Sequence, residues 1–307
     1  NEKKFINEVT INGKAFNSNF NLDIKKYFLE DESLNFILKF PQINLSVMAK
    51  MLPQKKNKDK YKIFSKVNFF GSEIKFEFDI EKNFLTFKSI KSKVFNSQID
   101  FNGIVEFQPF YIISNIILDQ LNLIKILNNN GLLFRLIERK NLIHKNFNSK
   151  IIIDIKNFSK GNIFDSAIFF IKTENGLIKF DDSVFSSNKL GSLKILSSDF
   201  YINDSGFFLN SQILIDVQNQ KKFYNIFQIP KIYKRDIKKI NLSFVTNLTL
   251  GTTKITNFQI NNIISNDLTK KINKAIKDNN INIYKNFNNW IVLKRFLNIV
   301  ILQVNQE

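Results

Sequence analysis

The sequence predicts a mainly β protein with antiparallel strands, a few short helices and a helical C-terminus. Three observations support this class. Apolar and polar side chains alternate with a period of two over most of the 307 residues. Each alternating run has one apolar and one polar face, which is typical of an antiparallel sheet with one side in water. A helical period of 3.6 residues occurs only in short segments.

Strong alternation begins in Ala15–Lys25, where Phe20, Leu22 and Ile24 share one face and asparagines occupy much of the other. Two further runs alternate in the same way: Leu34, Phe36, Leu38 and Phe40, and then Ile74, Phe76, Phe78 and Ile80. We expect these eight side chains to form one continuous apolar surface on neighbouring strands. Further strands are predicted at Tyr61–Phe69, Leu85–Ile90, Val94–Phe101, Ile104–Phe107, Tyr111–Leu118, Lys150–Lys156, Ile163–Lys172, Gly176–Phe180, Leu193–Ser198, Phe207–Val217, Asn241–Leu250 and Lys254–Ile260.

Short helices are expected between these strands and at the C-terminus. Val47, Met48, Met51 and Leu52 lie before Pro53 at a spacing that predicts about two helical turns over Leu45–Leu52. The charged run that follows, Gln54–Lys60, predicts a solvated loop. The other predicted helices are Leu121–Leu127, Gly131–Ile143, Asn219–Ile229, Asp267–Asp278 and Trp290–Val304.

These elements divide the chain into four parts. A first β-rich half at 1–120 is followed by a helical connection at 121–148, a second β-rich half at 149–265 and C-terminal helices at 266–307. No sharp linker separates them, so we expect one continuous domain. The last helix carries Lys294 and Arg295 in its middle, and it is too short to cross a bilayer. We expect its apolar stripe to pack over the β-structure or to lie at a membrane surface.

The sequence argues against catalysis and bound cofactors. It contains no cysteine and a single histidine, His144, so cysteine-based metal sites and His-rich sites are excluded and a Ser–His triad is improbable. Its nine glycines form neither a dinucleotide-binding nor a Walker motif. The acidic clusters Glu30-Asp31-Glu32 and Asp181-Asp182 fall where turns are expected, and a solvated loop explains both. We predict no enzyme activity, no metal and no cofactor.

The net charge of +18 would attract polyanions of any kind. Nucleic-acid readers use arginine for bidentate contacts, yet this chain has only Arg135, Arg139, Arg235 and Arg295. Its lysines are spread over the polar faces of nearly every strand. We therefore expect no specific nucleic-acid binding, and we note that anionic lipid headgroups would benefit from the same charge.

The apolar strand faces allow two interpretations. Two sheets could close face to face into a sandwich core. Alternatively, a single curved sheet could line a groove for acyl chains with its apolar face. The periodicity is the same in both cases and does not separate them.

Three segments resemble the C-terminal region of AsmA-like proteins of the Gram-negative envelope. The first is Gly103-Ile104-Val105-Glu106-Phe107-Gln108-Pro109, which leads into Leu118-Asp119-Gln120-Leu121-Asn122-Leu123. The second runs from Ile43-Asn44-Leu45 to Met51-Leu52-Pro53. The third runs from Asp204-Ser205-Gly206-Phe207-Phe208 through a strand to Val217, a helix at Asn219–Ile229 with Pro230, and Asn247-Leu248-Thr249-Leu250.

The resemblance covers about two thirds of the chain. AsmA-like proteins are similar to bridge-like lipid-transfer proteins, so it implies an elongated, curved antiparallel sheet that forms a taco-like groove. It also implies a non-catalytic periplasmic protein, held at the inner membrane by a segment upstream of Asn1. Phospholipid acyl chains and envelope assembly proteins would be its partners, and phospholipid transport or outer-membrane assembly its function. The rival expectation is a structural or interaction module with a closed β-sandwich core.

Overall fold

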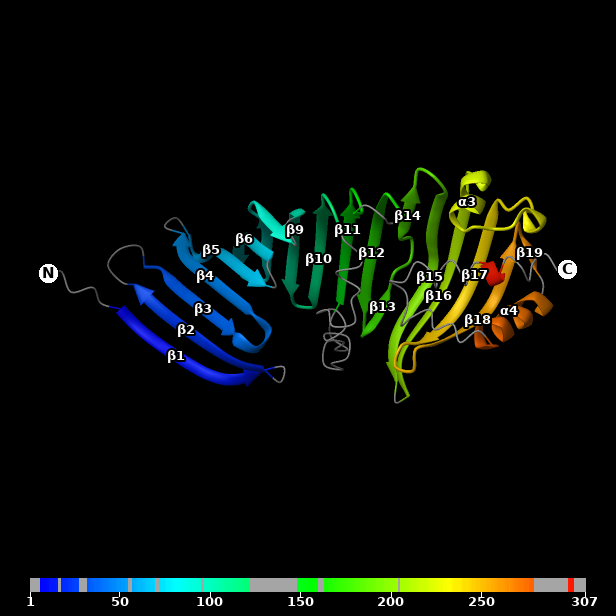
Figure 1. Ribbon diagram of the computed structural model, residues 1–307. Helices are drawn as coiled ribbons and strands as arrows, with labels where there is room; N and C mark the ends of the chain where they lie inside the picture. Colours follow the sequence, from blue (N-terminus) through cyan, green and yellow to red (C-terminus); the bar gives the residue numbers. More distant parts are fainter. Residues whose placement is uncertain are drawn as a thin grey trace. The chain divides into compact units, whose positions relative to one another are not determined.

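The computed structural model describes residues 6–15, 18–27, 32–54, 57–69, 72–94, 97–121, 148–159, 163–203, 205–264, 266–278 and 298–300. The chain divides into two compact units, Asn1–Gln120 and Leu121–Glu307. Figure 1 shows that strands dominate both units, which confirms the predicted mainly β, antiparallel class.

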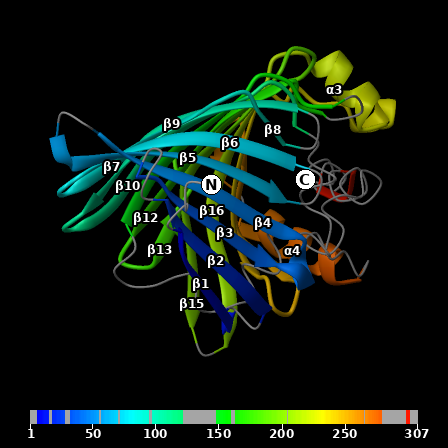
Figure 2. The ribbon, with the colours of Figure 1, turned by 90° about the vertical axis from the view of Figure 1, so that its left-hand side faces the viewer.

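The first unit is built from ten strands in its described part, and its strands pair with antiparallel neighbours. Pairing follows chain order from β1 to β7; β9 then pairs with β7, β8 and β10, and β8 also contacts β6. Figure 2 shows β1 to β6 as successive neighbours in one sheet. The strands are β1 (Ile6–Ala15), β2 (Ser18–Tyr27), β3 (Leu34–Phe40), β4 (Leu45–Gln54), β5 (Asn57–Phe69), β6 (Ser72–Glu81), β7 (Phe84–Ser89), β8 (Ser92–Val94), β9 (Ser97–Phe107) and β10 (Phe110–Leu118).

The second unit contains antiparallel strands and two described α-helices. Its strands are β11 (Asn148–Ile155), β12 (Ser166–Glu174), β13 (Leu177–Lys179), β14 (Val184–Ser187), β15 (Gly191–Asn203), β16 (Gly206–Val217), β17 (Lys239–Asn247), β18 (Thr252–Ile260) and β19 (Ile263–Ile264). The helices are α3 (Gln220–Ile226) and α4 (Asn266–Asp278). Figures 1 and 2 show them toward opposite ends of the strands of this unit.

The predicted helix at Leu45–Leu52 is wrong, because this segment lies in strand β4. Its side chains also alternate: Leu45, Val47 and Met51 share a face, and β4 pairs with β3 and β5 over its length. Pro53 lies inside the strand beside a register shift, a position at which a missing backbone donor is tolerated. Two neighbouring strands therefore override a local spacing that suits a helix as well as a strand.

The predicted loop at Gln54–Lys60 is also wrong in part, since β5 already begins at Asn57 and Gln54 pairs with Asn57. Strand β1 was not predicted from the sequence. The helices at Asn219–Ile229 and Asp267–Asp278 are confirmed as α3 and α4. Those at Leu121–Leu127 and Gly131–Ile143 lie outside the described residues except for Leu121, as does most of Trp290–Val304.

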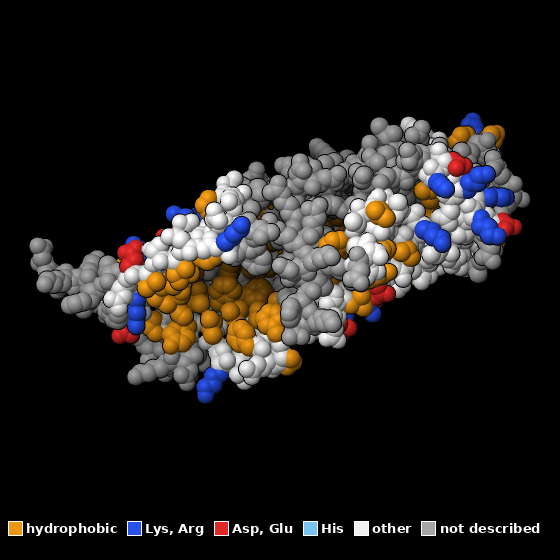
Figure 3. Space-filling view, turned by 90° about the horizontal axis from the view of Figure 1, so that it is seen from below, with side chains coloured by type: hydrophobic (Ala, Val, Ile, Leu, Met, Phe, Trp, Pro, Cys, Tyr) orange, Lys and Arg blue, Asp and Glu red, His pale blue; other side chains and the backbone are white. Residues whose placement is uncertain are grey.

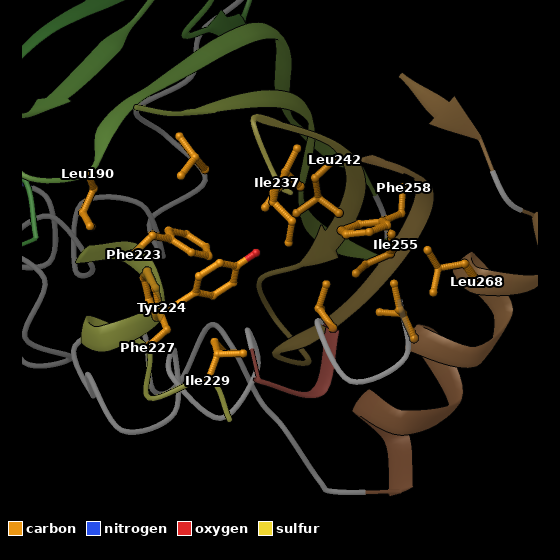
Figure 4. Close-up of a cluster of buried hydrophobic side chains, with 14 of the residues drawn as sticks. Leu190, Phe223, Tyr224, Phe227, Ile229, Ile237, Leu242, Ile255, Phe258 and Leu268 are labelled. Carbon is orange, nitrogen blue, oxygen red and sulfur yellow. The ribbon is translucent and has the colours of Figure 1, made fainter. Parts of the chain in front are cut away.

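The second unit contains the main hydrophobic core of the described residues (Figure 4). Phe223 and Tyr224 of α3, and Phe227 directly after it, share one buried cluster with Ile255 and Phe258 of β18. On the side of α4, Leu268, Ile272 and Ile276 join the same cluster. These three positions recur every four residues, as expected for the buried stripe of an amphipathic helix. The α-helices thus cover part of the apolar face of this unit.

Candidate functional site

The eight residues predicted to form an apolar surface lie on one face of the first unit. Directly paired residues on adjacent antiparallel strands point to the same side of a sheet. Leu34 pairs with Met51, Met51 with Ile63 and Ile63 with Phe78, which joins the β3 and β6 sets across β4 and β5. Equivalent rows join Phe36 to Phe76, Leu38 to Ile74, and Phe40 to Ser72.

This face is only partly buried in the described structure. Of the eight residues only Phe40 is buried, with 8% of its surface exposed, and the other seven are half-buried. In the described part of the first unit no α-helix covers the face. Figure 3 shows it as a broad hydrophobic patch over this unit.

Aromatic rings form the part of the face nearest to β9. Phe76 makes edge contacts with Phe78 and Phe101, at ring-centroid distances of 4.6 Å and 5.9 Å. Phe87 joins the group at 6.5 Å from Phe78 and 6.1 Å from Phe101. Such ring pairs hold one another in defined orientations, so this part of the surface is shaped before any ligand arrives.

A hollow of about 440 Å³ follows the cross-strand row from Phe36 to Phe76, and its lining also includes Ile37, Met48, Phe64, Lys66 and Lys75 of the two neighbouring rows. The cross-strand row here reads Phe36, Ala49, Ser65 and Phe76, so two small side chains separate two large ones. Ile37, Met48 and Phe64 point to the opposite side from Phe36 and Phe76, so this hollow is not confined to the apolar face of the eight residues.

The opposite face of the same sheet is polar and ion-paired. Glu73 contacts Lys66 at 2.6 Å and Lys75 at 2.8 Å, and these two lysines lower the pKa of Glu73 to about 2. Glu77 contacts Lys88 at 2.5 Å and Lys62 at 3.3 Å, and its pKa is lowered mainly by the hydrogen bond from Lys88. Cross-strand pairing of opposite charges is consistent with a solvated side. The ion pairs thus lie on one side of the sheet, which also exposes Met48 and Phe64 at 39% and 40%.

The second unit contains a separate apolar pocket of about 310 Å³. It follows strand β16 from Leu209 to Val217, two positions that lie about 26 Å apart at about 3.3 Å per residue. Its walls are mainly apolar side chains of β16 and its neighbouring strands, of α3 and the residue after it, and of the 298–300 segment: Leu193, Ile213, Ile215, Phe223, Phe227, Leu242, Phe244, Ile255, Phe258 and Val300.

A few hydroxyl groups line this pocket near its two ends. Thr246, which pairs with Leu209, lies 3.0 Å from Thr253 between the two Oγ1 atoms. Ser187, which pairs with Gly191 beside Val217, is only 5% exposed, and its Oγ has no hydrogen-bond partner among the described residues. A buried, unpartnered hydroxyl in an apolar wall is available to a polar atom of a ligand.

The second pocket was missed by the sequence analysis, although part of its signal was present. The alternation of Phe207–Val217 and Asn241–Leu250 predicts the two strand walls. Phe223 and Phe227 close one side of the pocket because of where α3 packs. The periodicity of the sequence does not predict this packing. Val300 lies in the stripe of the predicted C-terminal helix; it is 1% exposed and belongs to the core cluster.

The described residues hold no cluster of three or more His, Asp or Glu side chains arranged for a metal ion. Among them, too, no helix combines the length and hydrophobicity that a bilayer crossing requires. Comparison with models of known protein families and with curated proteins finds no match for this chain.

Proposed function

We propose that the chain is a non-catalytic protein that binds phospholipid acyl chains on its apolar β-sheet faces. The half-exposed row that joins Leu34 to Phe78 carries this proposal. This sheet has partly exposed large apolar side chains on one side and ion pairs on the other. Hydrocarbon chains would therefore bind to the apolar side, where they are shielded from water. The same observation favours an open face over the closed sandwich of the rival interpretation.

The energetics of such binding need no reacting groups. Each methylene that moves from water into an apolar environment contributes about 0.8 kcal/mol. Acyl chains could exchange along a surface of this kind because apolar contacts are non-directional and every row offers similar contacts. In the row Phe36, Ala49, Ser65 and Phe76, two small side chains lie between two phenylalanines, which leaves room for a chain between the rings.

The resemblance to AsmA-like proteins supports a cellular setting for this activity. We propose a periplasmic protein, held at the inner membrane, that supports phospholipid transport or outer-membrane assembly. Envelope assembly proteins would be its protein partners. Specific recognition of nucleic acids is no part of this function, because the chain is poor in the arginines that read bases.

The decisive experiment measures lipid on the purified chain. Mass spectrometry should detect co-purifying phospholipid, and a fluorescent fatty acid should bind and be displaced by phospholipid. Ala49→Phe adds a ring between Phe36 and Phe76 on the apolar face and should reduce probe binding several-fold. Leu52→Phe adds a ring on the same strand, on the side that faces away from this surface, and should leave binding unchanged. Absence of both lipid and probe binding, or equal effects of the two variants, would contradict the proposal.

A further inference from the structure

The segment that joins α3 to β17 carries an unusual concentration of charge. Between Gln218 and Lys239 the sequence has seven basic residues and one acidic residue, a net charge of +6 out of the +18 of the whole chain. All seven basic residues are exposed. We call these residues the basic corner: Lys221, Lys222, Lys231, Lys234, Arg235, Lys238 and Lys239.

An isoleucine lies at the surface in the middle of this charge. Ile232 is 80% exposed, which exceeds the 73% of Ile263 and the 66% of Leu250 in the same unit. It belongs to the short 3-10 helix η3 (Lys231–Tyr233), with Lys231 before it and Lys234 shortly after. An apolar side chain with basic neighbours on both sides has the composition of a membrane-interface contact.

The exposure of Ile232 is fixed by the structure on both sides of η3. Ile229 and Ile237 are buried in the core cluster, with 6% and 1% of their surfaces exposed. Tyr224 donates its hydroxyl hydrogen to the carbonyl of Arg235, and burial raises the pKa of Tyr224, which keeps that donor protonated. The segment between Ile229 and Ile237 is therefore held at both ends, and Ile232 points outward from it.

The side chain of Asn261 also holds the end of this segment in place. Its Oδ1 accepts hydrogen bonds from the backbone nitrogens of Lys238 and Lys239, at 2.8 Å and 3.0 Å, and its Nδ2 donates to the carbonyl of Asp236. Asp236 is the one acidic residue of the segment, and its carboxylate is engaged by Gln220 and by Lys238. The outer surface of the basic corner is left strongly positive.

We propose that the basic corner docks onto the surface of an anionic lipid bilayer, with Ile232 inserted between the headgroups. Basic residues near an anionic membrane each contribute about 1 kcal/mol of attraction. Burial of the isoleucine adds an apolar contribution that the phosphate backbone of a nucleic acid would not provide. Six of the seven basic residues are lysines, which also favours a diffuse anionic surface over base recognition.

This site is distinct from the acyl-binding faces, since docking requires no acyl chain in either of them. Its position is nevertheless informative. Helix α3 exposes Lys221 and Lys222 and buries Phe223, which lines the apolar pocket of the second unit. One wall of that pocket and part of the basic corner are therefore opposite sides of the same helix.

The test is co-sedimentation of the full chain with vesicles of phosphatidylcholine, with and without phosphatidylglycerol. The chain should bind the anionic vesicles and lose binding as salt rises. Lys231→Glu with Lys234→Glu should weaken binding tenfold or more, on the order expected for two reversed charges. Ile232→Ser should weaken binding several-fold and leave its salt dependence unchanged. Thermal melts establish that each variant is folded.

Two matched variants serve as controls. Lys274→Glu with Lys277→Glu makes the same charge change on exposed positions of α4, and Ile263→Ser removes another exposed isoleucine. Equal losses for test and control pairs would overturn the proposal and leave only a net-charge effect. The Lys231→Glu, Lys234→Glu variant is also tested for binding to random-sequence DNA. If this variant loses DNA binding but still binds anionic vesicles as the unmodified chain does, the proposal is overturned. Fatty-acid probe binding reports on the acyl-binding faces independently, so failure of either proposal is recognised separately.

Discussion

The side-chain amide of Asn273 forms hydrogen bonds with both backbone polar groups of Ile255. Its Oδ1 accepts from the Ile255 nitrogen at 2.8 Å, and its Nδ2 donates to the Ile255 carbonyl at 2.7 Å. Ile255 is 1% exposed, and no described strand pairs with it on this side of β18. Helix α4 therefore satisfies the edge of the sheet where a neighbouring strand would otherwise be needed.

Asn273→Ala should destabilise the second unit by about 1–3 kcal/mol, because it leaves a buried backbone donor and acceptor without partners. Urea unfolding followed by circular dichroism would measure the change. Lys274→Ala alters the adjacent exposed position of the same helix and should change stability by less than about 0.5 kcal/mol. Similar losses for both variants would mean that the amide pairing contributes little.

Gly103→Ala should destabilise the first unit by about 1–3 kcal/mol through overpacking. A Cβ atom at Gly103 would lie 2.3 Å from the Ile113 carbonyl oxygen and 2.4 Å from a ring carbon of Phe87. The matched variant is Gly13→Ala, where a Cβ would meet only the movable ring of Phe20, at 2.8 Å. Thermal unfolding should show a clearly larger loss for Gly103→Ala, and equal losses would refute the steric argument.

Acid should weaken the polar face through Glu73. The pKa of this residue is about 2 in the folded chain against an ordinary value of 4.5, so its contribution is fully present above pH 4.5. It is lost as pH falls from about 4.5 to about 2. Glu73→Gln should therefore lower the melting temperature at pH 7 and have little effect near pH 2. An effect of equal size at both pH values would contradict the ion-pair explanation.

Val300→Ala should cost about 2 kcal/mol, since the side chain is buried among α3 and β18 residues and contributes on the scale of a fully buried valine. Differential scanning calorimetry would measure this loss. Ile232→Ala truncates a side chain that is 80% exposed and should be nearly neutral for stability. A neutral Val300→Ala would show that the segment at 298–300 does not close this core.

Ile213→Phe should reduce binding of a fatty-acid probe, because it places added volume in the pocket of the second unit. Leu214→Phe makes a comparable change on the next residue of β16, which points to the opposite face. Titration of both variants with the probe gives the comparison. Equal binding by the two proteins would argue against ligand entry into this pocket.

The alternation of apolar residues was sufficient to predict most strands and the shared face of Leu34 and Phe78. It was weakest at Leu193–Ser198, and the structure explains this: the register shifts between Ile195 and Ser197 in strand β15. An irregularity of this kind changes which face each later residue occupies, so a short run of alternation ends there although the strand continues to Asn203.

Contacts between distant segments were not predictable in the same way. Ser92 exchanges hydrogen bonds with both backbone groups of Lys75, and Ser183 does the same with Phe170. In sequence these serines resemble any turn residue. Their roles depend on which strand ends nearby, and that is decided by tertiary packing, as it is for Val300.

The single-layer sheet of the first unit has a consequence for how such a chain can change length. Among the described residues, each strand from β2 to β5 pairs only with the strands before and after it. Stability is then close to a sum of nearest-neighbour terms, as in repeat proteins. Insertion or removal of a whole hairpin conserves strand direction and keeps the apolar side chains on one face. A sheet of this kind can be lengthened or shortened in evolution two strands at a time, and its apolar surface grows or shrinks in proportion.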